Sequence, residues 1–360
     1  MTMKISVTKS NLSRISEVDF ENIPFGKVFS DHMFIADYKD GKWDNCRIVP
    51  FAPMPMHPAM MAIHYGQSIF EGMKATKMQD GTPVLFRPEM HARRLNFSAQ
   101  RMCMPSFPEE WFLEALHQLV SIDQSWIPPQ EGSALYIRPF MFATDEFIGV
   151  KASQSYRFVI MTGPVGPYYP KPVRLITETQ YVRAVKGGVG EAKAAGNYGG
   201  SLLPAKLANE KGFDQVMWLD AVEFKYVQEV GTMNLFFVID GKVVTPGTYG
   251  AILRGITRDS FLKLLKDKGI PVEERLISID EIVEAYKAGK LQEAFGAGTA
   301  AVVAHVADIQ HLDFMMHLPP LEERKIGQML KDEINGMRSG RLDDPYGWVV
   351  PVKVQESVEV

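Results

Sequence analysis

The character of this chain is decided by two short runs, Lys193-Ala194-Ala195-Gly196-Asn197-Tyr198 and Glu229-Val230-Gly231-Thr232-Met233-Asn234. The first run sets a lysine beside a glycine turn, with a tyrosine close by and no other charge in the stretch. The second run places a lone glutamate just before an apolar strand, where a carboxylate is costly to bury without a partner. The two runs therefore predict that the Lys193 amine and the Glu229 carboxylate each bind a specific partner.

These residue types are the ones that hold and activate a pyridine aldehyde. The amine of a partly buried lysine can form a Schiff base with pyridoxal phosphate, and a carboxylate can pair with the protonated ring nitrogen. Taken alone, Lys193 is more often simply a solvent-exposed lysine, and Glu229 more often an edge glutamate that faces water. The rest of the chain therefore has to decide between these interpretations.

The composition is ordinary for a soluble globular protein. The chain has 360 residues, 46% of them hydrophobic and 23% charged, with a formal net charge of -4, so two domains are expected. No basic block indicates nucleic acid, and no apolar run approaches the roughly 20 residues that cross a bilayer. Cys46 and Cys103 have no metal or redox spacing, which indicates a reducing compartment. We therefore expect a cytoplasmic protein with no nucleic acid, membrane or metal as a partner.

A segment rich in glycine and proline divides the chain at residues 163–172. We predict a smaller N-terminal α/β domain over residues 1–164, an interdomain loop over residues 165–172 and a larger C-terminal cofactor-binding domain over residues 173–360. Strands and helices are mixed along the sequence, so the predicted fold class is mixed α/β.

Local patterns predict several element boundaries. Strands are predicted over residues 33–38, 135–142 and 235–239, and helices over residues 89–102 and 257–268. Capping boxes are predicted at Ser106 with Glu109 and at Ser278 with Glu281. A turn is predicted over Gly296–Thr299, which is not a dinucleotide fingerprint because the third glycine is absent. The helix that follows Gly255 offers an anion site at its N-terminus.

Seen with these features, the sequence closely resembles the branched-chain amino-acid aminotransferases, a group of fold-type IV pyridoxal phosphate enzymes. The likeness runs from about residue 20 to the end, through the two opening runs. It includes FGKVFSDHM at 25–33, YGQSIFEGMK at 65–74, LYIRP at 135–139, RGITR at 254–258 and FGAGTA at 295–300. The resemblance implies a two-domain fold with the active site at the domain interface.

The resemblance also implies how the cofactor, pyridoxal 5'-phosphate, is held. Lys193 matches the Schiff-base lysine, which also shuttles the substrate proton, Tyr198 the tyrosine near the phenolic oxygen, and Glu229 the partner of the ring nitrogen. The phosphate is assigned to Arg94, Ile256, Thr257 and Thr299. Arg94 is preferred over its neighbour Arg93 because it lies seven residues before Arg101, as in the family pattern.

Further matches imply how substrates are bound. Tyr65, Phe70, Tyr168 and Met233 match the apolar side-chain pocket, and Ile148 and Val150 match positions that reach across from the partner subunit of a homodimer. Arg138, with Tyr136 beside it, matches the arginine that meets the distal carboxylate of glutamate, and the Thr299-Ala300 turn matches the carboxylate site. The CxxC pair of some relatives is replaced by Ala301–Ala304, so thiol regulation is not expected.

The function implied is transamination of leucine, isoleucine and valine with 2-oxoglutarate, which gives branched-chain 2-oxo acids and glutamate. Two alternatives of the same fold are a D-amino-acid aminotransferase and an aminodeoxychorismate lyase, against which the EVGTMN run and the Tyr136–Pro139 segment argue. A third alternative is a non-catalytic protein that kept the fold. Visible absorbance that shifts with pH or on adding leucine would argue for catalysis.

Overall fold

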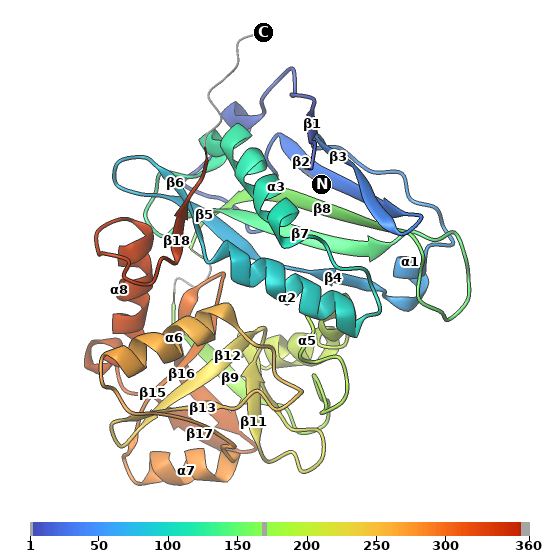
Figure 1. Cartoon of the computed structure of the whole chain (residues 1–360). Helices are drawn as coiled ribbons and strands as arrows, with labels where there is room; N and C mark the ends of the chain where they lie inside the picture. Colours follow the sequence, from blue (N-terminus) through green and yellow to red (C-terminus); the bar gives the residue numbers. More distant parts are fainter. Residues whose placement is uncertain (1–2, 168–170, 354–360) are drawn as a thin grey trace. The chain divides into compact units, whose positions relative to one another are not determined.

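The computed structural model describes residues 3–167 and 171–353, and the chain forms two compact units (Figure 1). The first unit takes in residues 1–168, 192–195 and 336–360, and the second takes in residues 169–191 and 196–335. Within the described ranges, no helix is long and apolar enough to cross a membrane.

The predicted domain limits need two corrections. Residues from Gly336 on belong to the first unit rather than to the C-terminal domain, because the strand Val349–Pro351 pairs with Pro83–Phe86. Ala192–Ala195 also belong to the first unit, since Ala194 forms a β-bridge to Ile69. The units separate between residues 168 and 169, inside the predicted loop 165–172, of which residues 168–170 lie outside the described residues.

The first unit is built on a sheet with the strand order β1-β3-β2-β8-β7-β5-β6-β18, and β4 pairs with β7. Only β1 and β3 run parallel; the other pairs are antiparallel. The predicted strands 33–38 and 135–142 lie within β2 and β7. The strands are β1 (Ser6–Val7), β2 (His32–Lys39), β3 (Lys42–Pro50), β4 (Ser68–Phe70), β5 (Met73–Lys77), β6 (Pro83–Phe86), β7 (Ala134–Ala143), β8 (Tyr156–Val165) and β18 (Val349–Pro351).

Two amphipathic helices, α2 (Pro88–Arg101) and α3 (Glu109–Ile122), cover one face of this sheet (Figure 1). Buried residues recur along α3 at Phe112, Leu116 and Leu119, the spacing of a helix with one apolar face. They join Phe34 and Phe158 of the sheet in one core. The shorter helices of this unit are η1 (Ile15–Glu17), α1 (Met61–Tyr65) and η2 (Gln124–Trp126).

Of the two predicted helix caps, the N-cap at Ser278 is confirmed, although the Glu281 carboxylate binds Arg275 instead of closing a capping box, and the cap at Ser106 is wrong. The Ser278 hydroxyl accepts a hydrogen bond from the Glu281 amide at 3.1 Å, as predicted. The helix predicted to start at Ser106 instead begins at Glu109, after Pro108. The Asn96 side chain binds both the N–H and the C=O of Phe107, each at 2.9 Å, which holds this stretch out of the helix.

The second unit contains a sheet with the order β11-β10-β9-β16-β15-β12-β13-β14. Because β11 pairs with β12 as well as with β10, the strands from β11 to β12 close on one another. β17 pairs with β16. The strands are β9 (Val173–Thr177), β10 (Gln215–Leu219), β11 (Val227–Val230), β12 (Met233–Ile239), β13 (Lys242–Pro246), β14 (Val272–Arg275), β15 (Leu291–Gly298), β16 (Val302–His311) and β17 (Phe314–His317).

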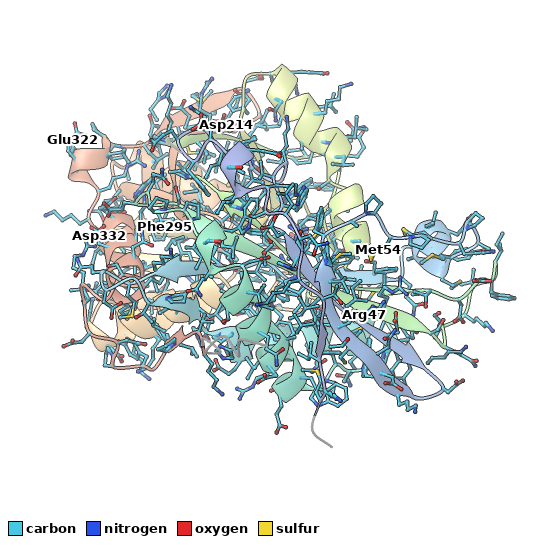
Figure 2. All side chains as sticks on the ribbon, turned by 90° about the horizontal axis from the view of Figure 1, so that it is seen from above. Arg47, Met54, Asp214, Phe295, Glu322 and Asp332 are labelled. Atoms are coloured by element: carbon cyan, nitrogen blue, oxygen red, sulfur yellow. The ribbon has the colours of Figure 1, made fainter. Side chains whose placement is uncertain are left out.

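Helices α6 (Ile256–Asp267) and α7 (Ile279–Lys287) pack on opposite faces of this sheet. Successive side chains of a strand point to opposite faces of the sheet, so consecutive residues of β12 pack against different helices. Phe236 lies edge-on to Phe261 of α6 and stacks on Phe295, whose position on β15 is marked in Figure 2. Phe237 instead joins the core that contains Ile282 of α7. The other helices are α4 (Ala195–Gly199), α5 (Leu202–Glu210), η3 (Leu321–Glu323) and α8 (Ile326–Arg338).

The predicted turn at Gly296–Thr299 is wrong by three residues. Gly296 and Gly298 belong to β15, and the turn occupies residues 299–301. Glycine is needed here because the side chain of Met233, a residue of β12, packs against β15. A Cβ added to Gly296 would come within 2.9 Å of the Met233 Cε. A glycine inside a strand permits such a close approach.

Candidate active site

The lysine of the first run is held within the first unit through its backbone. The Phe70 amide donates to the Lys193 carbonyl at 3.0 Å, and the Lys193 amide donates to the Ser98 hydroxyl at 2.9 Å. The Lys193 Nζ lies 4.8 Å from the centre of the Phe70 ring. An ammonium group that lies on an aromatic face is weakly attracted to it. The backbone hydrogen bonds and the Phe70 ring therefore orient the Lys193 amine together.

A second cationic side chain lies against the Phe70 ring. The Arg138 guanidinium lies 4.7 Å from the centre of the same ring and donates to the Tyr136 hydroxyl at 3.1 Å. Tyr136 can approach because residue 72 is glycine: a Cβ there would collide with the Tyr136 hydroxyl oxygen. Four predicted site residues, Lys193, Phe70, Tyr136 and Arg138, therefore meet in one place.

Arg94 is engaged by a buried acid. Its Nε and Nη2 donate to the two Glu71 oxygens at 2.7 and 2.8 Å, and His91 Nδ1 lies 2.7 Å from Glu71 Oε2. Burial alone would raise the pKa of Glu71, but Arg94 and His91 outweigh it and hold that pKa well below its usual range. Arg93 points to solvent, with 65% of its side chain exposed against 9% for Arg94. Arg94 is thus the inward arginine of the pair.

Burial also acts on the neighbouring histidine. It lowers the pKa of His91, in spite of Glu71, and the charges of Arg94 and Lys193 act in the same direction. His91 is therefore held as a neutral ring around physiological pH. The cluster carries the charges of Arg94, Glu71 and Lys193 side by side.

Three predicted substrate residues lie at the surface of the first unit. Tyr65, at the end of α1, is 42% exposed, and Ile148 and Val150 are 64% and 88% exposed. Single exposed apolar side chains are common on protein surfaces, and Leu12 of the same unit is 77% exposed. Another predicted substrate residue, Tyr168, lies outside the described residues.

In the second unit, the Glu229 run forms a tight hairpin between β11 and β12. Val230 pairs with Met233 and Glu229 pairs with Asn234, so the turn consists of residues 231 and 232. Gly231 has a φ of 52°, a conformation that favours glycine. Since opposite residues on paired strands share a face, this turn places the carboxylate of Glu229 beside the amide of Asn234.

Glu229 is only 3% exposed and is held by two side chains. Asn234 Nδ2 donates to its Oε1 at 3.3 Å, and Arg183 forms an ion pair with its Oε2. Arg183 Nη2 also donates to the carbonyls of Gly190 and Ala251 at 3.3 and 3.1 Å. The acid is therefore charge-balanced and oriented by residues of its own unit.

The tyrosine of the first run meets this acid at a cavity. Tyr198, Glu229, Gly231 and Thr232 all line it. The glycine turn predicted after Lys193 is wrong, because Gly196 lies in the short helix α4. That helix carries Tyr198 to the cavity, so the structure brings Tyr198 and Glu229 together although they are far apart in sequence.

Ile256 and Thr257 are the first residues of α6, and both are buried. Gly255 before them is extended, with a ψ of 132°, so the first amides of the helix form a donor group at its positive end. Thr299 and Ala300 lie half-buried in the turn between β15 and β16. Helix starts of this kind bind phosphate and carboxylate groups.

The sequence patterns missed four residues that hold the predicted ones. Arg183 and Asn234 support Glu229, and Glu71 and His91 surround Arg94. Asn234 and Glu71 stand inside the quoted runs, and the five-residue step from Glu229 to Asn234 could have indicated a two-residue hairpin. Arg183 gave no signal of its own, since it stands in an unremarkable stretch far from its partner.

The residues of the second unit have the donor and acceptor chemistry that a pyridinium ring and a phosphate require. Glu229 is buried yet lines a cavity, so it can meet a cationic ring nitrogen, and the Tyr198 hydroxyl shares that cavity. A helix N-terminus for an anion lies in the same unit. Within the described residues, no cluster of His, Cys, Asp and Glu could hold a metal ion.

Comparison with known sequences gives consistent relatives. Residues 68–309 match the family described as amino-transferase class IV. The chain is 48% identical over 355 residues to branched-chain-amino-acid aminotransferase 2 of Bacillus subtilis, covering 98% of this chain and 97% of the relative. It is 43% identical over 344 residues to a branched-chain-amino-acid aminotransferase of Mycolicibacterium smegmatis, covering 93% and 94%.

Solved structures of such enzymes share the fold. A branched-chain aminotransferase from Thermoproteus uzoniensis with norvaline superposes with a TM-score of 0.75 at 25% identity, over 89% of this chain and 99% of that one. A branched-chain amino acid aminotransferase from Escherichia coli gives 0.70 at 27% identity, over 90% and 99%. The predicted mixed α/β fold is confirmed by these likenesses.

Proposed function

The chain belongs to the class IV aminotransferases, and from this premise we propose that it moves the amino group of leucine, isoleucine and valine onto 2-oxoglutarate with pyridoxal 5'-phosphate as cofactor. The products are branched-chain 2-oxo acids and glutamate. The observation that carries the proposal is a buried acid, Glu229, which lines a cavity with Tyr198. Such an acid is suited to a ring nitrogen that must stay protonated.

When bound, the pyridine ring supplies an electron-withdrawing system that stabilises negative charge on the substrate α carbon. Lys193 Nζ would hold the cofactor aldehyde and, once released, take the proton from the substrate α carbon and deliver it to the C4' carbon of the cofactor. Glu229 would keep the ring nitrogen protonated, and the Tyr198 hydroxyl would donate to the phenolic oxygen. Arg183 and Asn234 keep the Glu229 carboxylate in place for this work.

Anion recognition would draw on several groups. Ile256 and Thr257, at the start of α6, would receive the phosphate through their amides and the Thr257 hydroxyl, together with Thr299. Arg94 would add a charge whose direction is set by Glu71. The amides at Thr299 and Ala300 would accept the substrate carboxylate.

The substrate side chain would rest on Phe70, and the resemblance assigns Tyr65, Tyr168 and Met233 to the same apolar pocket. Each buried CH2 favours binding by about 0.8 kcal/mol, which suits leucine, isoleucine and valine. Glutamate must use the same pocket, and Arg138, on the Phe70 ring beside Tyr136, would meet its distal carboxylate.

We further propose a cytoplasmic homodimer. Ile148 and Val150 support it, since they match the positions that reach across from the partner subunit and both are exposed, so that a second copy of the chain could contact them. The free thiols of Cys46 and Cys103 support a reducing compartment.

Purified protein loaded with pyridoxal phosphate tests the function. We expect visible absorbance that changes on adding leucine, and turnover of leucine with 2-oxoglutarate that yields glutamate. Activity restricted to D-amino acids, or release of pyruvate from aminodeoxychorismate, would contradict the proposal.

A further inference from the structure

Asn234 has contacts that packing alone does not require. Its side chain is 4% exposed, and Nδ2 donates both to Glu229 Oε1 at 3.3 Å and to the Leu253 carbonyl at 2.9 Å. An amide nitrogen carries two hydrogens, so both are used. One points to the acid, and the other to the segment that leads into α6.

The amide oxygen of Asn234 is fixed by a glycine. A Cβ added to Gly255 would collide with Asn234 Oδ1, so any side chain at residue 255 would displace the amide. Gly255 is the residue that precedes the first turn of α6. The Asn234 side chain is therefore clamped between the acid and the start of the proposed phosphate-binding helix.

We propose that Asn234 is a positioning residue that ties the Glu229 carboxylate to the N-terminus of α6 and so sets the separation between the acid and the anion site before the cofactor binds. The inference rests on the proposed function and deepens it. Asn234 does not touch the reacting atoms; it acts through Glu229 and through the Leu253 carbonyl. Arg183 holds the other carboxylate oxygen, so the acid cannot turn toward Asn234 alone.

Loss of the Asn234 side-chain amide should weaken cofactor binding. A hydrogen bond to a charged group contributes more than a neutral one, and a buried acceptor left unpaired is penalised. Asn234→Ala removes both donors. Asn234→Asp keeps the shape but replaces the donor with a second carboxylate beside Glu229, so it should do more harm than alanine.

The test is titration of cofactor-free protein with pyridoxal phosphate, followed by visible absorbance. We expect Asn234→Ala to weaken binding about tenfold or more, and Asn234→Asp to weaken it further. The pH at which the absorbance of the bound cofactor changes should also move. In a Glu229→Gln background, Asn234→Ala should have a much smaller effect, because the two residues act as one unit.

Gln228→Ala is the matched control. Gln228 is a buried amide on the same strand, one residue from Glu229, and so faces the other side; its loss should leave cofactor affinity and the absorbance profile unchanged. If alanine at residue 234 prevents folding, Asn234→Asp combined with Glu229→Gln decides the question, because the amide and the carboxylate are then exchanged and no like charges face each other; this double variant should bind the cofactor no more weakly than Glu229→Gln alone.

The inference is overturned if Asn234→Asp binds like wild type, or if Asn234→Ala has the same effect with and without the Glu229 carboxylate. Failure of the proposed function would look different. In that case wild-type protein would bind no pyridoxal phosphate, or Glu229→Gln would leave its affinity unchanged.

Discussion

Two buried glutamates, one in each unit, are held in similar ways but placed differently. Glu71 is fully buried and bound by Arg94 and His91. Glu229 is nearly as buried and bound by Arg183 and Asn234, but it also lines a cavity. A buried acid with an arginine is therefore not by itself a sign of chemistry; access to a cavity is what distinguishes a working acid from a supporting one.

We expect the loss of Glu71 and the loss of Glu229 to have different consequences. Glu71 orients Arg94 and balances its charge, so its loss should appear first in stability. Glu229 can meet a ligand, so its loss should appear first in turnover. The variants below are ordered by the size of the effect that we expect.

Glu71→Gln should destabilise the protein by about 3–5 kcal/mol, the scale for removing one member of a buried ion pair. Because Arg94 holds the folded pKa of Glu71 below its unfolded value, this stability is present above the unfolded pKa and is lost as pH falls toward the folded one. Urea unfolding of cofactor-free protein measures it. Glu109→Gln, which breaks the exposed pair with Arg93, should change stability by less than about 0.5 kcal/mol; equal losses would break the comparison.

Glu229→Gln should lower the turnover of leucine by about 100-fold, in line with the loss of a group that stabilises charge in the transition state by keeping the ring nitrogen protonated. The loss should lie mainly in kcat, and its cost in stability should be smaller than that of Glu71→Gln, because Glu71 loses a two-bond contact with Arg94 as well as a bond with His91. Steady-state kinetics with unfolding on the same samples checks both. Unchanged kcat with a large loss of stability would make Glu229 a second supporting acid.

Lys74 extends the comparison to a buried charge near another charge of the same sign. Burial, with Arg338 nearby, lowers the pKa of Lys74 to about 7, whereas an unfolded lysine titrates near ~10.4. Between these values the unfolded chain binds more protons, so stability should rise with pH. Lys74→Met should therefore stabilise the protein by about 1–3 kcal/mol at pH ~6, with the gain fading as pH rises toward the unfolded pKa. A gain that is independent of pH would contradict this.

Arg138→Gln should raise the KM for glutamate about tenfold while changing that for leucine little, since only glutamate has a distal carboxylate. Arg93→Gln, on the exposed side of α2, is the control and should leave both unchanged. Kinetics with each amino donor distinguishes the outcomes. Equal losses for both donors would mean that Arg138 only supports Phe70 and Tyr136.

The sequence predicted the residues of single motifs better than their partners. Glu229 and Asn234 stand in one run, and a hairpin brings them together locally. Tyr198 and Lys193 likewise share a run, although the short helix between them was not foreseen. Such local patterns are readable because the contacts they set span few residues.

The contacts that were not predicted join distant segments. Arg183, in the loop that follows β9, meets Glu229 of β11 across a long separation in sequence, and Val349–Pro351 pairs with β6 from near the other end of the chain. The Ser106 cap failed for the same reason, since the competing bond comes from Asn96 on another helix. Local propensity could not foresee these tertiary contacts.

The most direct test of the role of Lys193 is borohydride reduction of the cofactor-loaded protein, followed by peptide mapping. We expect loss of the visible absorbance and a reduced pyridoxyl group on Lys193. A label on Lys186 or Lys206 instead, or none at all, would contradict the assignment.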